Sequence, residues 1–169
     1  MHLPLIDTKL SYKGRNIFTT FGALKLKLLG RILAIDYGGK RVGLAVTDPM
    51  KIIANSLTTV ETPKLMEFLT GYFAKEQVEK VVVGLPKQMN NHPSQSMPMI
   101  ESFVAKFKLN FPTMPVVYVD ERFTSKIAMR AMIDGGVKKK DRQNKALVDS
   151  VSATIILQSY LEGLQYNSL

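Results

Sequence analysis

The chain has 169 residues, of which 46% are hydrophobic and 22% charged, a composition typical of a globular domain that excludes wholesale disorder. It has no cysteine, which excludes disulfides and thiolate-bound zinc, so any metal would need oxygen ligands. The formal net charge is +9, but residues 1–35 supply +5 of it, and charge alone is therefore weak evidence for a nucleic-acid partner.

Residues 1–30 are predicted to form a poorly ordered extension, because they hold turn formers and no sustained amphipathic period. They have few acids, so an organelle-targeting peptide is an alternative interpretation. We expect one organised domain over residues 31–162 and a short tail over residues 163–169. No apolar run approaches the roughly 20 residues that a membrane-spanning helix needs, so the protein is expected to be soluble.

The organised domain is predicted to open with a β-hairpin. Residues 31–37 and 41–47 are apolar runs, and the turn between them contains two glycines. A third strand is predicted over residues 52–60, after an Asp-Pro turn. Thr62 and Pro63 then predict the start of a helix that runs to about residue 76, with Thr62 as its N-cap.

The rest of the chain alternates between short apolar runs, typical of strands buried on both faces, and stretches with helical spacing. In order, the pattern predicts a strand over residues 81–86, a helix from Ser96 that ends before Phe111, a strand over residues 116–119, a helix from Thr124 that ends at Gly135, and a last helix over residues 144–162. A meander followed by right-handed crossovers gives an α/β fold with a mixed five-stranded sheet in the order 3-2-1-4-5 and helices on both faces.

Carboxylates fall at corresponding places in this topology. Asp36 lies near the end of the first strand, Asp120 and Glu121 end the fifth, and Asp149 lies in the last helix on the face expected to pack on the sheet. Parallel strands place their carboxyl ends at one edge, where open sheets of this kind hold their sites. The sequence therefore predicts that these acids converge.

Converging carboxylates without a matching set of bases favour a divalent cation, and oxygen ligands favour Mg²⁺ or Mn²⁺. Strand alternation puts Asp120 and Glu121 on opposite faces, and we favour Glu121 as the ligand. Purely structural roles are the alternatives. Asp36 could close its turn, Asp120 could pair with Arg122 or cap the next helix, and Asp149 could be an N-cap.

Basic residues lie beside the predicted cluster. Lys40 and Arg41 occupy the hairpin tip, and Arg122 follows the acids of the fifth strand, so these three are candidates to hold phosphates. A second basic patch is formed by Lys138, Lys139 and Lys140, for which a solvated loop is the alternative interpretation.

Four segments together resemble the YqgF (RuvX) family, whose members are pre-16S rRNA nucleases or Holliday-junction-resolvase-like proteins. They are IDYGGKRVGLAVTD over residues 35–48, VVGLP over residues 82–86, YVDERFTS over residues 118–125 and DSVSA over residues 149–153. The segments occur in order over residues 31–162. The loop after residue 86 departs from the family pattern, because it lacks an Asp-Gly-Ser-like step.

The resemblance implies an RNase H-like fold, a cytoplasmic location and processing of the 5′ end of 16S rRNA during ribosome maturation. Matched position by position, it implies that Asp36, Glu121 with Asp120 beside it, and Asp149 are the catalytic and metal-binding acids. Implied partners are precursor 16S rRNA in a pre-ribosomal particle, with branched DNA as the alternative substrate, and no membrane.

We therefore expect a divalent-metal-dependent nuclease, a monomer or at most a weak homodimer, acting on structured RNA. One rival is an ATP-binding protein of the actin type, although such proteins need two lobes and this chain has room for one. Another is a ribosome-assembly factor that kept the fold without the chemistry. Junction-cutting DNA nucleases need two sites, hence a symmetric dimer, and no dimerisation helix is evident.

Overall fold

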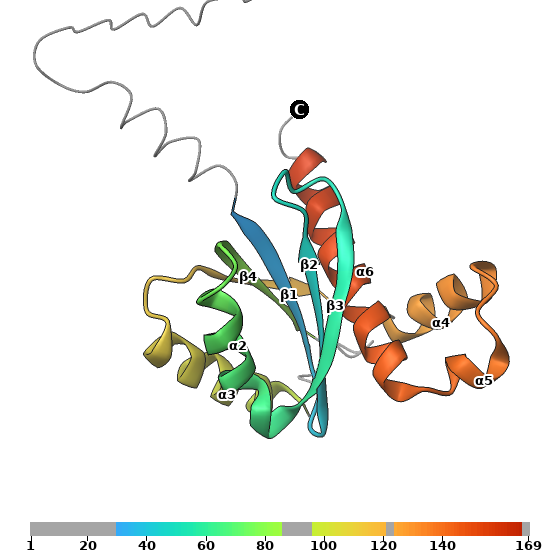
Figure 1. The fold of residues 1–169 in the computed structure, drawn as a ribbon, viewed down its shortest axis with the longest axis horizontal. Helices are drawn as coiled ribbons and strands as arrows, with labels where there is room; N and C mark the ends of the chain where they lie inside the picture. Colours follow the sequence, from blue (N-terminus) through green and yellow to red (C-terminus); the bar gives the residue numbers. More distant parts are fainter. Residues whose placement is uncertain (1–29, 86–95, 121–123, 167–169) are drawn as a thin grey trace, which may run out of the picture.

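The computed structural model describes residues 30–85, 96–120 and 124–166 (Figure 1). Its strands are β1 Arg31–Tyr37, β2 Arg41–Thr47, β3 Ala54–Glu61, β4 Val78–Leu85 and β5 Val116–Asp120. Its helical segments are η1 Thr62–Lys64, α2 Leu65–Phe73, α3 Met97–Asn110, α4 Thr124–Asp134, α5 Lys139–Arg142 and α6 Lys145–Tyr166. Apart from Gly30, the predicted extension lies outside the described residues, as do the predicted loop over residues 87–95 and the end of the tail.

The five strands form one sheet in the order β3-β2-β1-β4-β5, which confirms the predicted topology. The β1–β2 and β2–β3 pairs are antiparallel, and the β1–β4 and β4–β5 pairs are parallel. Helices α2 and α3 cover one face and α6 covers the other, so the molecule has the three layers of an RNase H-like fold (Figure 1).

Strand β1 is buried on both faces, and its side chains alternate between two cores. Leu33 and Ile35 belong to the cluster formed with α2 and α3, whereas Ile32 and Ala34 belong to the cluster formed with α6. All four are at most 1% exposed, so the central strand is anchored from both sides. This alternation also decides which face each functional side chain of the sheet occupies.

The core under α2 and α3 is rich in aromatic rings. Phe111 lies with its ring centroid 5.0 Å from those of Phe73 and Phe107, which joins the ends of the two helices. Each such pair adds about 0.5–1.5 kcal/mol beyond the area it buries. Helix α3 ends at Asn110, as the Phe-Pro sequence predicts.

The core under α6 is built from smaller side chains. Ala34, Ala45 and Ala153 are fully buried between the sheet and the helix, together with Ile156 and Leu157. Alanine side chains allow a helix to lie close to a sheet, and α6 is thereby held along β1 and β2. No helix in the described part of the chain is both long and apolar enough to cross a lipid bilayer.

The third strand begins at Ala54 rather than at the predicted residue 52, because Asp48 organises the preceding turn. Its carboxylate accepts backbone N–H groups from Met50, Ile52 and Ile53 at 2.9, 2.8 and 2.8 Å. Because these backbone N–H groups bond to Asp48, they are not available for pairing between β2 and β3, and the pairing starts at Ala54.

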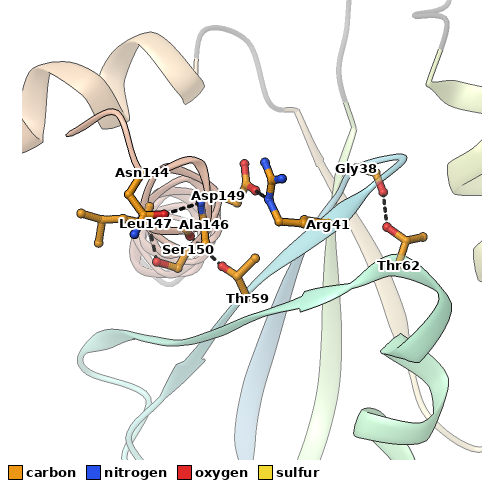
Figure 2. Close-up of polar contacts among 9 residues, drawn as sticks. All are labelled: Gly38, Arg41, Thr59, Thr62, Asn144, Ala146, Leu147, Asp149 and Ser150. Atoms are coloured by element: carbon orange, nitrogen blue, oxygen red, sulfur yellow. Dashed lines mark hydrogen bonds and ion pairs between the residues drawn. The ribbon is translucent and has the colours of Figure 1, made fainter. Parts of the chain in front are cut away.

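The predicted capping role of Thr62 is also wrong. Its hydroxyl donates to the carbonyl oxygen of Gly38 at 2.7 Å, and η1 begins with no side-chain cap (Figure 2). The acceptor, the Gly38 carbonyl, belongs to the β1–β2 hairpin and lies 24 positions away in the sequence, so the sequence alone does not predict this bond.

Other boundaries differ as well. Helix α2 ends at Phe73 rather than near residue 76, and β4 begins at Val78 rather than at residue 81. Helix α6 continues past residue 162 to Tyr166, and the basic stretch predicted to be a loop contains the short helix α5.

Replacement of Asp48 by alanine should lower the melting temperature at neutral pH and have less effect in acid. The N–H groups of Ile53, Ile52 and Met50 hold the pKa of the Asp48 carboxyl below its ordinary value of 3.8. A carboxyl with a lowered pKa stabilises the fold above its unfolded-state pKa, and this contribution is lost as the pH falls from there through the folded-state pKa. Circular dichroism melts across this range should show the two proteins converging. An equal gap at all pH values would contradict this account.

Candidate active site

Asp36 is the sixth residue of β1 and lies at the carboxyl end of the strand. It follows Ile32 and Ala34 in the alternation, so its side chain belongs to the face covered by α6. Directly opposite it in the antiparallel ladder is Gly43 of β2. Asp36 is partly buried, which suits a carboxylate at the margin of a core rather than one free in solvent.

Gly43 allows the backbone of α6 to lie directly on β2. A Cβ atom built on Gly43 would overlap the carbonyl group of Asp149, so no residue with a side chain fits here without displacing the helix. Asp149 lies in the second turn of α6. Because Gly43 is the ladder partner of Asp36, Asp36 lies on the strand next to this contact and on the face of the sheet that α6 covers.

The first turn of α6 is fixed by two polar contacts (Figure 2). The Asn144 side-chain carbonyl accepts the Ala146 N–H at 3.0 Å, which caps the helix. The Thr59 hydroxyl of β3 donates to the Ala146 carbonyl at 2.7 Å. Thr59 is the ladder partner of Gly43, so the Thr59 bond and the Gly43 packing hold one end of the helix over one row of the sheet. The sequence did not predict these roles of Asn144 and Thr59, although an Asn just before a helical stretch is a recognisable cap signal.

Arg41 makes an ion pair with Asp149. Its Nε donates to Oδ2 of Asp149 at 2.9 Å, and the side chains are 34% and 29% exposed. Arg41 lies two residues before Gly43 on β2 and so shares its face. Figure 2 shows its guanidinium reaching from the strand to the helix. The sequence singled out Arg41 for phosphates, but it gave no sign of a partner within the protein.

Of the two candidate acids at the end of the fifth strand, only Asp120 is among the described residues. Asp120 is the last residue of β5, is exposed and pairs with Leu85. Val119 packs in the α6 cluster and Val116 in the other, so alternation assigns Asp120 to the face away from Asp36. Glu121 and Arg122 lie outside the described residues.

A complete ligand set is therefore not visible in the described ranges. No group of three or more His, Asp and Glu side chains within residues 30–85, 96–120 and 124–166 could hold a metal ion. Two of the three predicted carboxylates, Asp36 and Asp149, belong to elements that meet at Gly43, and the third predicted ligand, Glu121, lies outside those ranges.

Exposed lysines lie at two places near this edge. Lys40 is at the hairpin tip, where its carbonyl accepts the Thr62 N–H at 3.2 Å. Lys138, Lys139 and Lys140 lie at the start of α5, immediately before α6 in the chain, and all three are exposed. In Figure 1, α4 and α5 project beside the amino-terminal half of α6, the half that carries Asp149. The lysines are thus free to meet a polyanion.

A three-layer fold with a five-stranded sheet in the order β3-β2-β1-β4-β5 is that of an RNase H-like protein. The chain belongs to the RuvX family, described as Holliday junction resolvase, whose model matches residues 30–163. The family predicted from the four sequence segments is therefore confirmed.

Curated relatives are similar over most of the chain. One from Bacteroides thetaiotaomicron is 60% identical over 138 residues, which are 82% of this chain and 100% of the relative. One from Flavobacterium psychrophilum is 64% identical over 131 residues, which are 78% of this chain and 96% of the relative. Both are named "Putative pre-16S rRNA nuclease". Among solved structures, Thermus thermophilus RuvC is 15% identical with a TM-score of 0.45, covering 80% of this chain and 96% of that one.

Replacement of Gly43 by alanine should lower the free energy of unfolding by about 1–3 kcal/mol, because the added methyl group overlaps the α6 backbone. Gly71→Ala is the matched control. Its new Cβ has no atom within 4 Å, and it lies inside helix α2, where alanine should stabilise by up to about 1 kcal/mol. Chemical denaturation measures both, and a Gly43→Ala protein as stable as the wild type would disprove the close contact.

Proposed function

We propose that the chain is a divalent-metal-dependent nuclease that processes the 5′ end of precursor 16S rRNA in the cytoplasm. The observation that supports the proposal is the packing of Gly43, the ladder partner of Asp36, against the backbone of Asp149, which is where strand β2 and helix α6 come together. Carboxylates gathered from distant parts of a chain need positive charge nearby, because like charges repel and each loses hydration. Arg41 supplies one such charge to Asp149, and we propose that a divalent cation supplies the rest when it binds.

The donor atoms fit a hard cation. Asp36 and Asp149 offer carboxylate oxygens, and the chain has no thiolate that would favour a softer metal. We propose Glu121 as the third ligand rather than Asp120, because alternation assigns Asp120 to the opposite face. Bound Mg²⁺ or Mn²⁺ would supply an activated water and stabilise charge on the leaving oxygen of a phosphodiester. The protein's part is to hold the carboxylates in place, through the packing of α6 on β2.

The substrate is proposed from the relatives and from the basic residues. The relatives that cover most of this chain are named for pre-16S rRNA, and exposed lysines flank the aspartates at the hairpin tip and on α5. We assign Lys40, Arg41 and Arg122 to phosphates near the cleaved bond, and Lys138, Lys139 and Lys140 to phosphates farther along the RNA. Branched DNA is the second candidate, favoured by the family description. It would require two copies of the site in a symmetric dimer.

Asp36→Asn should leave the fold intact and reduce Mn²⁺-dependent cleavage of a precursor 16S rRNA fragment by more than roughly a hundredfold. Loss of residues that merely orient ligands costs about 10–100-fold, and a ligand itself should cost more. Asp134→Asn is the matched control, because Asp134 is an exposed aspartate paired with Arg130 at 3.1 Å on α4. Equal cleavage by wild type and pure, folded Asp36→Asn would refute the site. A four-way DNA junction, assayed in parallel, decides between the two substrates.

Replacing Lys138, Lys139 and Lys140 by glutamine should weaken RNA binding and its dependence on salt. Each phosphate contact to a single strand contributes about 0.7 to the slope of log K against log salt, so three contacts should lower its magnitude by about 2. The control replaces Lys106 and Lys108, exposed lysines of α3 on the opposite face of the sheet. Fluorescence anisotropy over a salt series measures the slopes, and an unchanged slope in the triple variant would remove α5 from the interface.

A further inference from the structure

The ion pair between Arg41 and Asp149 occupies one of the proposed metal ligands. The bond runs from the guanidinium Nε to carboxylate Oδ2 at 2.9 Å, and about two thirds of each side chain is buried. A partly buried ion pair is screened less by water and salt than a surface ion pair, so the attraction between its two charges is stronger. The contact joins residues 108 positions apart in the sequence, so it is a feature of the tertiary fold.

A guanidinium and a divalent cation compete for such a carboxylate. Both seek the oxygens of Asp149, and the two positive groups repel each other if they bind side by side. Arg41 is fixed to β2 two residues from Gly43, so it stays close to Asp149 whether or not the bond is made. Its side chain has several rotatable bonds, which allows the guanidinium to move aside while the strand stays in place.

We propose that Arg41 is a positioning residue that acts as the resident counter-ion of Asp149 and is displaced from it when the divalent ion binds. This inference rests on the proposed function, since it takes Asp149 as a metal ligand. In the metal-free protein, Arg41 neutralises and orients the carboxylate through Oδ2, and metal binding breaks this 2.9 Å bond because the two positive groups repel each other across one carboxylate. The ion pair therefore lowers the affinity for the metal below what the carboxylates alone would give.

The displaced guanidinium acquires a second use. It carries five N–H donors in a fixed fork that matches a phosphate group. Once it leaves Asp149, it lies beside the metal site with no carboxylate on its Nε. Arg41 would thus have two successive partners. It pairs with Asp149 in the metal-free protein and is free to bind a phosphate once the metal is bound.

The test measures Mn²⁺ binding rather than cleavage. Free Mn²⁺ is followed by electron paramagnetic resonance during titration of the full chain, for wild type, Arg41→Gln and the matched control Arg31→Gln. Arg31 makes a similar ion pair, Nε to Glu76 Oε2 at 2.9 Å with side chains 28% and 42% exposed, at the other end of the hairpin. Arg41→Gln should tighten Mn²⁺ binding by about three- to tenfold, whereas Arg31→Gln should change it less than about twofold.

The variant Asp36→Asn, titrated in the same way, distinguishes failure of the counter-ion role from failure of the metal site. If Asp36→Asn abolishes Mn²⁺ binding but Arg41→Gln binds Mn²⁺ as the wild type does, or more weakly, the counter-ion role is overturned and the metal site stands. If Asp36→Asn binds Mn²⁺ as the wild type does, or if the wild type binds none, the metal site fails and the counter-ion role fails with it.

A measurement on the unaltered protein covers the case in which Arg41→Gln does not fold. The Nε–H signal of Arg41 can be followed by nuclear magnetic resonance, assigned through its own backbone amide, while Mg²⁺ is added. We expect slow exchange of this proton with water in the metal-free protein and faster exchange at saturating Mg²⁺. An exchange rate that Mg²⁺ leaves unchanged would overturn the proposal.

Discussion

The contact between Gly43 and the backbone of α6 is the constraint on which the rest of the site depends. At this point the helix lies directly against a strand, and there is no room for even a methyl group. The strand alone would place Asp36 at a sheet edge, and the helix alone would carry Asp149 on one of its faces. Their contact fixes the strand that carries Asp36 relative to the helix that carries Asp149, and the hydrogen bond from Thr59 to the Ala146 carbonyl holds the helix end on the sheet.

The same constraint explains why a basic residue lies among the acids. Packing α6 onto β2 leaves Asp149 partly buried, and a carboxylate there is unfavourable without a positive partner. Arg41 supplies that partner from the strand on which the helix rests. The carboxylate that we propose as a metal ligand is thus paired with a cation of the protein itself. The protein combines this with lysines that are exposed and so remain accessible to a polyanion.

Much of this architecture is predictable from the sequence, because local patterns determine it. The apolar runs and the Gly-rich turn predict the hairpin, and the alternation of runs and helical spacings predicts the sheet order. Strand alternation also predicts that Asp120 and Glu121 lie on opposite faces, but the face of Asp120 follows only from the packing of Val116 and Val119. What the sequence does not predict depends on contacts between distant elements. The pairing of Arg41 with Asp149, the bond from Thr62 to Gly38 and the delayed start of β3 all require knowing which groups lie side by side. Sequence position records none of these distances.

The parallel pairing of β1 with β4 and the position of α6 at the end of the chain have a consequence for biosynthesis. The hairpin with Asp36 and Arg41 emerges early from the ribosome, whereas Asp149 follows more than a hundred residues later. A nascent chain that lacks α6 has an uncovered sheet face, and Arg41 has no Asp149 to pair with. The Arg41–Asp149 ion pair can therefore form only after α6 has been synthesised and has packed on β2.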